Sequence, residues 1–170
     1  MKNGTVIDCN SLYPYVMKSF SMPYGEPIFF EGQYKKDTDY PLFIQQFYCE
    51  FKLKENKIPT VMKKCNGLYS GNQYLENSGD TGMVLTMTNI DLELFFENYE
   101  IIGKIKYLSG WKFKCMKGIF EKYIDTWINI KNFATVKNIP ALRQTAKLML
   151  NALYRETCNK SRRTKQNFIC

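Results

Sequence analysis

Hydrophobic and polar side chains alternate most clearly between residues 42 and 54. One face of this segment is apolar, and it consists of Phe47, Cys49, Phe51 and Leu53. The other face consists of Gln46, Tyr48, Glu50 and Lys52. Because successive side chains of a strand point to opposite faces of a sheet, this pattern predicts a half-buried strand of an antiparallel sheet.

Shorter extended segments surround this strand and predict a β-rich middle of the chain. Strands are expected at residues 26–32, 60–64, 83–88 and 99–108, with 60–64 as a neighbour of the long strand. Turns are expected at residues 22–25 and 109–110, and a loop or hairpin at 66–82, where Gly, Asn and Ser are frequent. Thr88 with Asp91 resembles a capping box and predicts a short helix to about residue 97.

Helices are expected before and after this middle section. Residues 11–20 follow a first strand and predict a short helix. After Lys117 an apolar stripe recurs at helical spacing, which is typical of an amphipathic core helix. Its members are Ile119, Phe120, Tyr123, Ile124, Trp127 and Ile130.

A second helix is expected from Pro140 to about Tyr154, after a link at residues 132–138. Two helices joined by a short link form a helical hairpin. The apolar positions of the second helix are Leu142, Ala146, Met149 and Leu153.

Composition narrows the choice of partners and chemistry. The chain has 170 residues and a formal charge of +8, which favours a polyanion such as nucleic acid, although an anionic membrane would also suit it. There is no His, so Ser-His and Cys-His catalysis is excluded within these residues. Six cysteines without a C-x-x-C pair argue against zinc and for a reducing, cytoplasmic compartment. No leader peptide or membrane-length apolar run is visible, so no membrane partner is expected.

Candidate chemistry lies first in residues 6–14, which read VIDCNSLYP. The pattern predicts a buried strand that ends at Asp8, then a helix capped by Asn10 or Ser11. A carboxylate at this position can hold a hard cation, and the first N–H groups of the helix can bind phosphate. The alternative is purely structural, because an Asp between a strand and a Ser-capped helix is common.

A second candidate lies on the second helix, where four polar side chains are spaced by four, four and three residues. They are Arg143, Lys147, Asn151 and Tyr154. Such spacing places them on one face, where they could bind a triphosphate and its nucleoside. The alternative is an ordinary solvated basic face.

The two motifs together resemble family B DNA polymerases. DCNSLYP is similar to the first palm motif, Asp-x-x-Ser-Leu-Tyr-Pro, and KLMLNALY is similar to the fingers motif, Lys-x-x-x-Asn-Ser-x-Tyr-Gly. Ala152 and Arg155 replace the usual Ser and Gly of the second motif. The segments TNIDLELFFENYEI and WKFKCMKGIFEKYIDTWINIK look like the protein-primed branch found in phages and linear plasmids.

The resemblance implies an α+β fold: a partial polymerase palm, a β-rich insertion and a helical-hairpin fingers segment. The palm fragment would be 1–23, and the insertion, which contacts the terminal protein in this branch, would be 24–112. The fingers hairpin would be 113–154. Residues 155–170 form a divergent basic tail that could be disordered and touch nucleic acid nonspecifically.

The resemblance also implies a reaction, the transfer of dNMP from a dNTP to a primer 3′-hydroxyl on template DNA with two Mg²⁺ ions. Asp8 would be a catalytic metal ligand, and the carbonyl of Cys9 a further ligand. The amides of Leu12 and Tyr13 would hold the triphosphate, and the ring of Tyr13 would exclude a ribose 2′-hydroxyl.

The fingers residues have matching roles. Lys147 would contact the triphosphate, while Asn151 and Tyr154 would line the base-pair pocket. Arg143 is assigned to the nucleotide by helical spacing alone. The implied partners are primer–template DNA, dNTP and a terminal protein, in the cytoplasm of a phage-infected or mobile-element-bearing host cell.

Two family features are missing from these residues. No Asp follows Asp125, so the second catalytic motif, Asp-Thr-Asp in type, is absent, and so is the exonuclease domain that normally precedes the palm. The isolated chain is therefore expected to be an inactive polymerase fragment. The alternatives are a non-catalytic module that binds nucleic acid, dNTP or terminal protein, and a remnant of a decayed mobile element.

Overall fold

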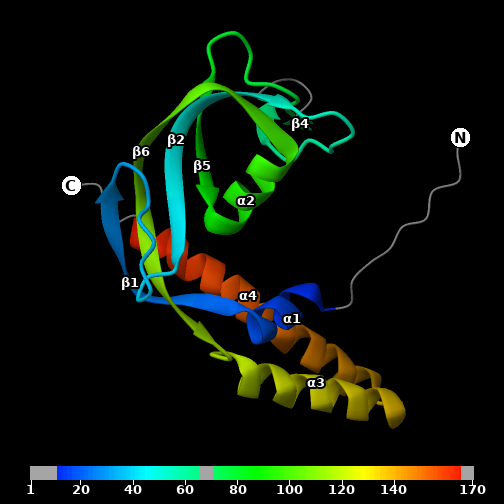
Figure 1. Ribbon diagram of the computed structural model, residues 1–170. Coiled ribbons are helices and arrows are strands. Elements are labelled where there is room, and N and C mark those ends of the chain that lie inside the picture. Colours follow the sequence, from blue (N-terminus) through cyan, green and yellow to red (C-terminus); the bar gives the residue numbers. More distant parts are fainter. Residues whose placement is uncertain (1–10, 66–70, 166–170) are drawn as a thin grey trace, which may run out of the picture. The chain divides into compact units, whose positions relative to one another are not determined.

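The computed structural model describes residues 11–65 and 71–165, and the chain divides into two compact units (Figure 1). Unit 1 consists of Met1–Met22 and Met116–Cys170, and unit 2 is Pro23–Cys115. Helices and an antiparallel sheet are both present, which confirms the predicted α+β class.

Unit 2 is built on a four-stranded sheet in the order β1-β6-β2-β5. These strands are β1 (Ser21–Glu31), β6 (Tyr99–Lys117), β2 (Leu42–Leu53) and β5 (Met83–Thr88). Strand β2 pairs antiparallel with both β5 and β6, and helix α2 (Asn89–Asn98) contacts β2 and β5. A separate antiparallel hairpin is formed by β3 (Met62–Cys65) and β4 (Gly71–Tyr74).

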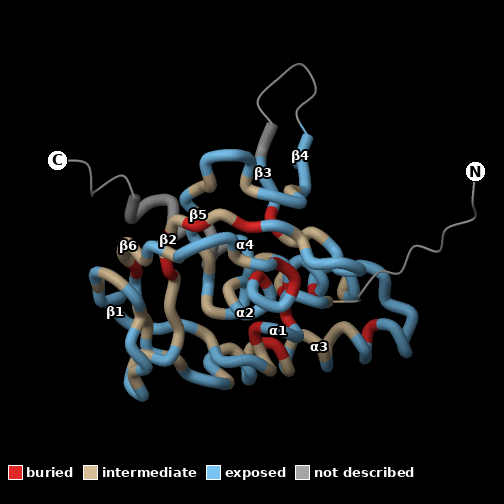
Figure 2. Tube along the Cα trace, turned by 45° about the horizontal axis from the view of Figure 1, so that its top comes forward, coloured by how far each residue is buried: buried red, intermediate tan, exposed pale blue. Residues whose placement is uncertain are grey.

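The core of unit 2 lies on the apolar face that the alternation predicted. Phe47, Cys49 and Phe51 of β2 are fully buried. Figure 2 colours the buried positions along the chain red. Phe95 of α2 and Tyr99 of β6 complete this core, with ring centroids 5.0 Å apart. Burial of such large apolar side chains is the main stabilising contribution to a unit of this size.

Two buried polar side chains join distant parts of unit 2. The Gln45 amide nitrogen donates to the carbonyls of Gly32 and Ser109, and its oxygen accepts from the backbone N–H of Tyr34. The Tyr99 hydroxyl donates to the carbonyl of Leu75 and accepts from two backbone N–H groups at residues 60 and 61. Because their hydrogen bonds are satisfied, these groups can be buried without a large desolvation penalty.

The predictions of turns at residues 22–25 and 109–110 are both wrong. Residues 22–25 belong to β1, where Pro23 is tolerated because β1 is an edge strand that need not donate every N–H group. Gly110 lies inside β6, and a Cβ atom there would collide with the Phe30 ring and the Ile44 carbonyl. This glycine permits close packing rather than a turn.

The prediction that residues 60–64 lie next to the long strand is also wrong. Residues 62–65 pair with 71–74, whereas the neighbours of β2 are β5 and β6. The cap of α2 is confirmed, since the Thr88 hydroxyl accepts from the Asp91 N–H at 3.2 Å and donates to the Asp91 carboxylate at 2.8 Å. Part of the predicted loop, residues 66–70, lies outside the described residues.

Unit 1 contains three helices around a small core of its own. They are α1 (Leu12–Ser19), α3 (Glu121–Val136) and α4 (Pro140–Lys165). Met17, Ile124 and Leu150 form the buried centre, one from each helix. Part of the predicted stripe packs against them, namely Phe120, Tyr123 and Trp127.

The helical hairpin is confirmed, but its boundaries differ from the prediction. Helix α3 continues to Val136, and Asn138 ends it in the left-handed conformation with φ 52°. The N–H groups of Asn138 and Ile139 bond to the carbonyls of Thr135 and Ala134, which is a Schellman arrangement. Helix α4 does not end near residue 154 but continues to Lys165, so residues 155–165 are helical rather than disordered.

Candidate nucleotide-binding site

Helix α1 begins at the palm-like motif. Ser11 precedes it in the left-handed conformation with φ 57°, and Pro14 is buried in its first turn. Of the two predicted caps, Asn10 lies outside the described residues, and the Ser11 alternative is wrong because its hydroxyl makes no cap hydrogen bond. It instead accepts a hydrogen bond from the Lys131 Nζ at 3.3 Å. The Ser11 side chain therefore leaves the first N–H groups of α1 without a side-chain cap.

Two predicted site residues from opposite ends of the sequence meet here. The rings of Tyr13 on α1 and Tyr154 on α4 stack with centroids 4.3 Å apart and planes inclined by 17°. Both rings keep substantial exposure, 57% for Tyr13 and 39% for Tyr154. The stack therefore brings the palm-like motif and the fingers-like motif together on the surface of unit 1.

The remaining predicted residues of α4 lie on its exposed side. Arg143, Lys147 and Asn151 are all exposed, while Ala146 and Leu150 are buried. Among the residues whose side chains the structure describes (11–63 and 71–155), no ion pair or side-chain hydrogen bond engages these three polar side chains. They are thus available to an external ligand.

A further contact joins α1 to α3 at the other end of α1. The Lys18 Nζ lies 2.5 Å from the Asp125 Oδ1. Hydrogen bonding to Asp125 raises the pKa of Lys18. The Asp125 carboxylate therefore faces helix α1. Together with the Ser11–Lys131 contact, this pair connects α1 to α3 at both ends.

Lys131 is the site residue that sequence reasoning missed. Its ammonium group is placed at the N-terminus of α1, where the helix dipole is positive. The Lys131 ammonium group and the positive end of the α1 dipole together favour the binding of an anion. In the sequence, Lys131 interrupts the apolar stripe seven residues after the buried Ile124, but no local pattern indicates its contact with Ser11.

The net charge of the chain is carried by unit 1. This unit contains thirteen of the 24 Lys and Arg residues and four of the 16 Asp and Glu residues, a net of +9. Unit 2 contains the other eleven and twelve, a net of −1. A polyanionic ligand is therefore attracted to the unit that carries the two motifs.

Two predicted site residues, Asp8 and Cys9, lie outside the described residues. Among the residues that the structure does describe, no group of three or more His, Cys, Asp or Glu side chains could hold a metal ion. In the same part of the chain, no helix is long and apolar enough to cross a membrane.

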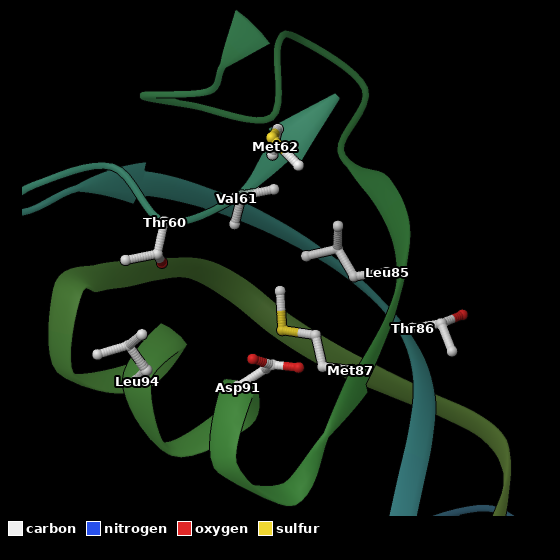
Figure 3. A pocket seen from close by; sticks show the side chains of 8 residues that line it. All are labelled: Thr60, Val61, Met62, Leu85, Thr86, Met87, Asp91 and Leu94. Carbon is white, nitrogen blue, oxygen red and sulfur yellow. The ribbon is translucent and has the colours of Figure 1, made fainter. Parts of the chain in front are cut away.

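Unit 2 has a surface pocket of its own (Figure 3). It lies between α2, β5 and the segment that leads into β3, and Leu94 and Met62 are 43% and 53% exposed beside it. The Asp91 carboxylate supplies a negative charge to an otherwise largely apolar lining. The lining residues are Thr60, Val61, Met62, Leu85, Thr86, Met87, Asp91 and Leu94.

The α+β fold and the two motifs resemble those of family B DNA polymerases. The model of the family described as DNA polymerase type B, organellar and viral, matches residues 1–168, so the chain belongs to this family. The predicted resemblance to family B polymerases is thereby confirmed.

Individual relatives agree with this assignment. The chain is 50% identical to the DNA polymerase of Bacillus phage phi29 over 151 residues, which are 89% of this chain and 25% of the relative. It is 32% identical to the DNA polymerase of Streptococcus phage Cp-1 over 154 residues, 88% of this chain and 26% of that relative. The chain thus spans about a quarter of the length of the curated relatives that it matches.

Solved structures give the same result. The phi29 DNA polymerase complexed with primer–template DNA and incoming nucleotide matches with a TM-score of 0.76 and 50% identity, over 86% of this chain and 25% of that one. An orthorhombic crystal form of phi29 DNA polymerase matches with a TM-score of 0.79.

Proposed function

We propose that this chain is the part of a protein-primed DNA polymerase that binds the incoming dNTP between palm and fingers. The observation that carries the proposal is the Tyr13–Tyr154 stack, which joins the two motifs within unit 1. Relatives that are 50% identical to this chain over 151 aligned residues are DNA polymerases, and one was solved with primer–template DNA and nucleotide.

The phosphates would bind to cations and amides of unit 1. Lys147 lies about 10 Å along the α4 axis from Tyr154, and Arg143 about 16 Å, at 1.5 Å per residue. A nucleoside held at Tyr154 would therefore extend its phosphates toward Lys147, with Arg143 beyond it. Lys131 and the amides of Leu12 and Tyr13 would neutralise the same chain of phosphates from α1 and α3.

The nucleoside would bind at the tyrosine stack. The exposed part of the Tyr13 ring would lie under the sugar, where a ribose 2′-hydroxyl would collide with it. Tyr154 and Asn151 would line the pocket for the new base pair, the first by ring contact and the second by its exposed amide. Selection of deoxyribonucleotides would thus depend on the position of Tyr13, which the stack holds.

Divalent metal would be held by Asp8 and the carbonyl of Cys9, because Mg²⁺ prefers oxygen ligands. Two Mg²⁺ ions supply charge stabilisation for phosphoryl transfer when bound in such enzymes. The described residues of this chain would contribute binding and orientation of the dNTP.

A terminal protein is the proposed partner of unit 2. Its pocket combines apolar side chains with the Asp91 carboxylate, and Leu94 and Met62 beside it are well exposed. Such a lining suits a protein segment with apolar and basic side chains better than it suits DNA, because a carboxylate repels phosphate.

The competing function is a module that binds nucleotide or DNA without chemistry. The sequence supports it for the isolated chain, because no Asp-Thr-Asp motif follows the fingers motif. The isolated 170 residues would therefore bind dNTP but not extend a primer.

Nucleotide titration of the purified chain tests the proposal. Binding of dNTP should be detectable by calorimetry with Mg²⁺ present, and the matching nucleoside without phosphates should bind far more weakly. Lys122→Ala, on the exposed surface of α3, is a control that should leave the affinity unchanged. Equal affinity for nucleoside and dNTP, or no dNTP binding, would contradict the proposed site.

A further inference from the structure

Two lysines of β6 share one aromatic ring in unit 2. The Lys112 Nζ lies 5.1 Å from the centroid of the Tyr40 ring, and the Lys114 Nζ lies 5.5 Å from it. Each ammonium group is attracted to the negative face of the ring, but the two positive charges also repel each other. A bound anion would relieve this repulsion.

The charges around this ring are only partly balanced. Lys112 forms an ion pair with Asp37, with 2.6 Å between Nζ and Oδ2. Lys114 is exposed and has no carboxylate partner in the described part of the chain. The loop that carries Tyr40 adds exposed Lys35 and Lys36.

The loop and the two lysines of β6 together contain four lysines and two aspartates. These residues are Lys35, Lys36, Lys112, Lys114, Asp37 and Asp39. Unit 2 as a whole has a net charge of −1, so this positive cluster runs against the overall charge of the unit. Of these lysines, Lys112 and Lys114 lie directly at the Tyr40 ring.

The loop under the cluster is held in a fixed conformation. The Tyr34 ring stacks on Phe43, with centroids 3.9 Å apart, and its hydroxyl donates to the Tyr40 carbonyl at 2.8 Å. The same hydroxyl accepts from the Asp37 N–H at 3.1 Å. The backbone that carries Tyr40 and Asp37 is thus organised before any ligand arrives, which lowers the entropic cost of binding beside them.

We propose that Lys112 and Lys114, gathered around Tyr40, bind a phosphate of the DNA backbone, at a site separate from the nucleotide-binding residues of unit 1. This proposal rests on the proposed function only in naming DNA as the anion. Ammonium groups over the Tyr40 ring favour a phosphate contact over base stacking on that ring. The contact is accordingly independent of base sequence.

Anisotropy titration of the full chain with labelled duplex oligonucleotides, without dNTP, tests the site. Lys114→Ala should weaken binding roughly eightfold at ~0.1 M salt and reduce the slope of log K against log[salt] by about 1. Two oligonucleotides of different sequence should lose affinity equally. Lys114→Arg keeps the charge and should retain most of the affinity.

Lys106→Ala is the matched control, since Lys106 is an exposed lysine of the same strand outside the cluster. Thermal melting of each variant separates loss of binding from loss of folding. An affinity for Lys114→Ala equal to that of Lys106→Ala, a sequence-dependent loss, or no DNA binding by the chain overturns the proposal. In each case the dNTP titration still tests the proposed nucleotide site separately, because that site lies in unit 1 and Lys114 lies in unit 2.

Discussion

The Tyr13 and Tyr154 rings stack at a centroid distance of 4.3 Å, although they belong to the first and last helices of the chain. Tyr13 is fixed by a buried turn of α1 that includes Pro14 and Met17. Tyr154 is fixed by α4, whose buried side includes Leu150. The position of either ring therefore depends on the packing of the other helix.

Replacement of Tyr13 tests the proposed sugar contact. In a chimera that carries this segment in place of the matching part of the phi29 polymerase, Tyr13→Val should reduce discrimination against ribonucleotides by roughly tenfold or more, equivalent to about 1.4 kcal/mol or above. Use of dNTP should change less, because the deoxyribose does not collide with the ring. Incorporation rates for dNTP and rNTP measure the ratio, and an unchanged ratio contradicts the assignment. Tyr13→Phe keeps the ring and should behave like the unmodified chimera.

Lys147 should recognise phosphates rather than bases. Lys147→Ala should weaken the affinity of the chain for all four dNTPs alike, by roughly 10- to 150-fold if one charge-assisted contact worth about 1.5–3 kcal/mol is lost. Calorimetric titration with each dNTP measures this. Lys137→Ala removes an exposed cation from the α3–α4 connection and serves as the control. A loss confined to one or two bases would argue that Lys147 contacts the base.

The stability of unit 1 should depend on Leu150 more than on Met149. Sequence reasoning placed Met149 in the apolar set, but Met149 is only half-buried and Leu150 is 2% exposed in the core with Met17 and Ile124. Leu150→Ala should lower the free energy of unfolding by about 2–5 kcal/mol. Leu148→Ala, at a position 58% exposed, should change it by less than about 0.5 kcal/mol. Equal effects in chemical denaturation would refute this packing.

Alkaline pH should destabilise unit 2 through Cys49. Burial raises the pKa of the Cys49 thiol to about 11, whereas an unfolded thiol ionises near 8.5. The unfolded chain loses this proton first as the pH rises, so stability should fall between these values by roughly 1.4 kcal/mol per pH unit. Cys49→Val should flatten this part of the stability profile. A profile that is the same in both proteins would exclude Cys49 as the cause.

Elements that are marked by a pattern of neighbouring residues could be predicted from the sequence. The alternation around Phe47 and Phe51 and the stripe around Ile124 both mark faces that are buried. The Thr88 cap could also be predicted, because the hydroxyl and its N–H partner are three residues apart.

Features that depend on distant partners could not be predicted in this way. Gly110 looked like a turn residue because its collision partners, Phe30 and Ile44, are remote in sequence. The pairing of β2 with β6 and β5 rather than with residues 60–64 has the same origin. Lys131 was missed because its importance depends on contact with Ser11 on another helix.

Primer extension by the phi29 chimera tests whether this chain forms the nucleotide-binding part of a polymerase active site. The chimera should extend a labelled primer with Mg²⁺ and dNTP, and Asp8→Ala in its transplanted segment should abolish extension. The isolated 170-residue chain should not extend the primer. A folded chimera without activity, or one whose activity survives Asp8→Ala, would contradict the account.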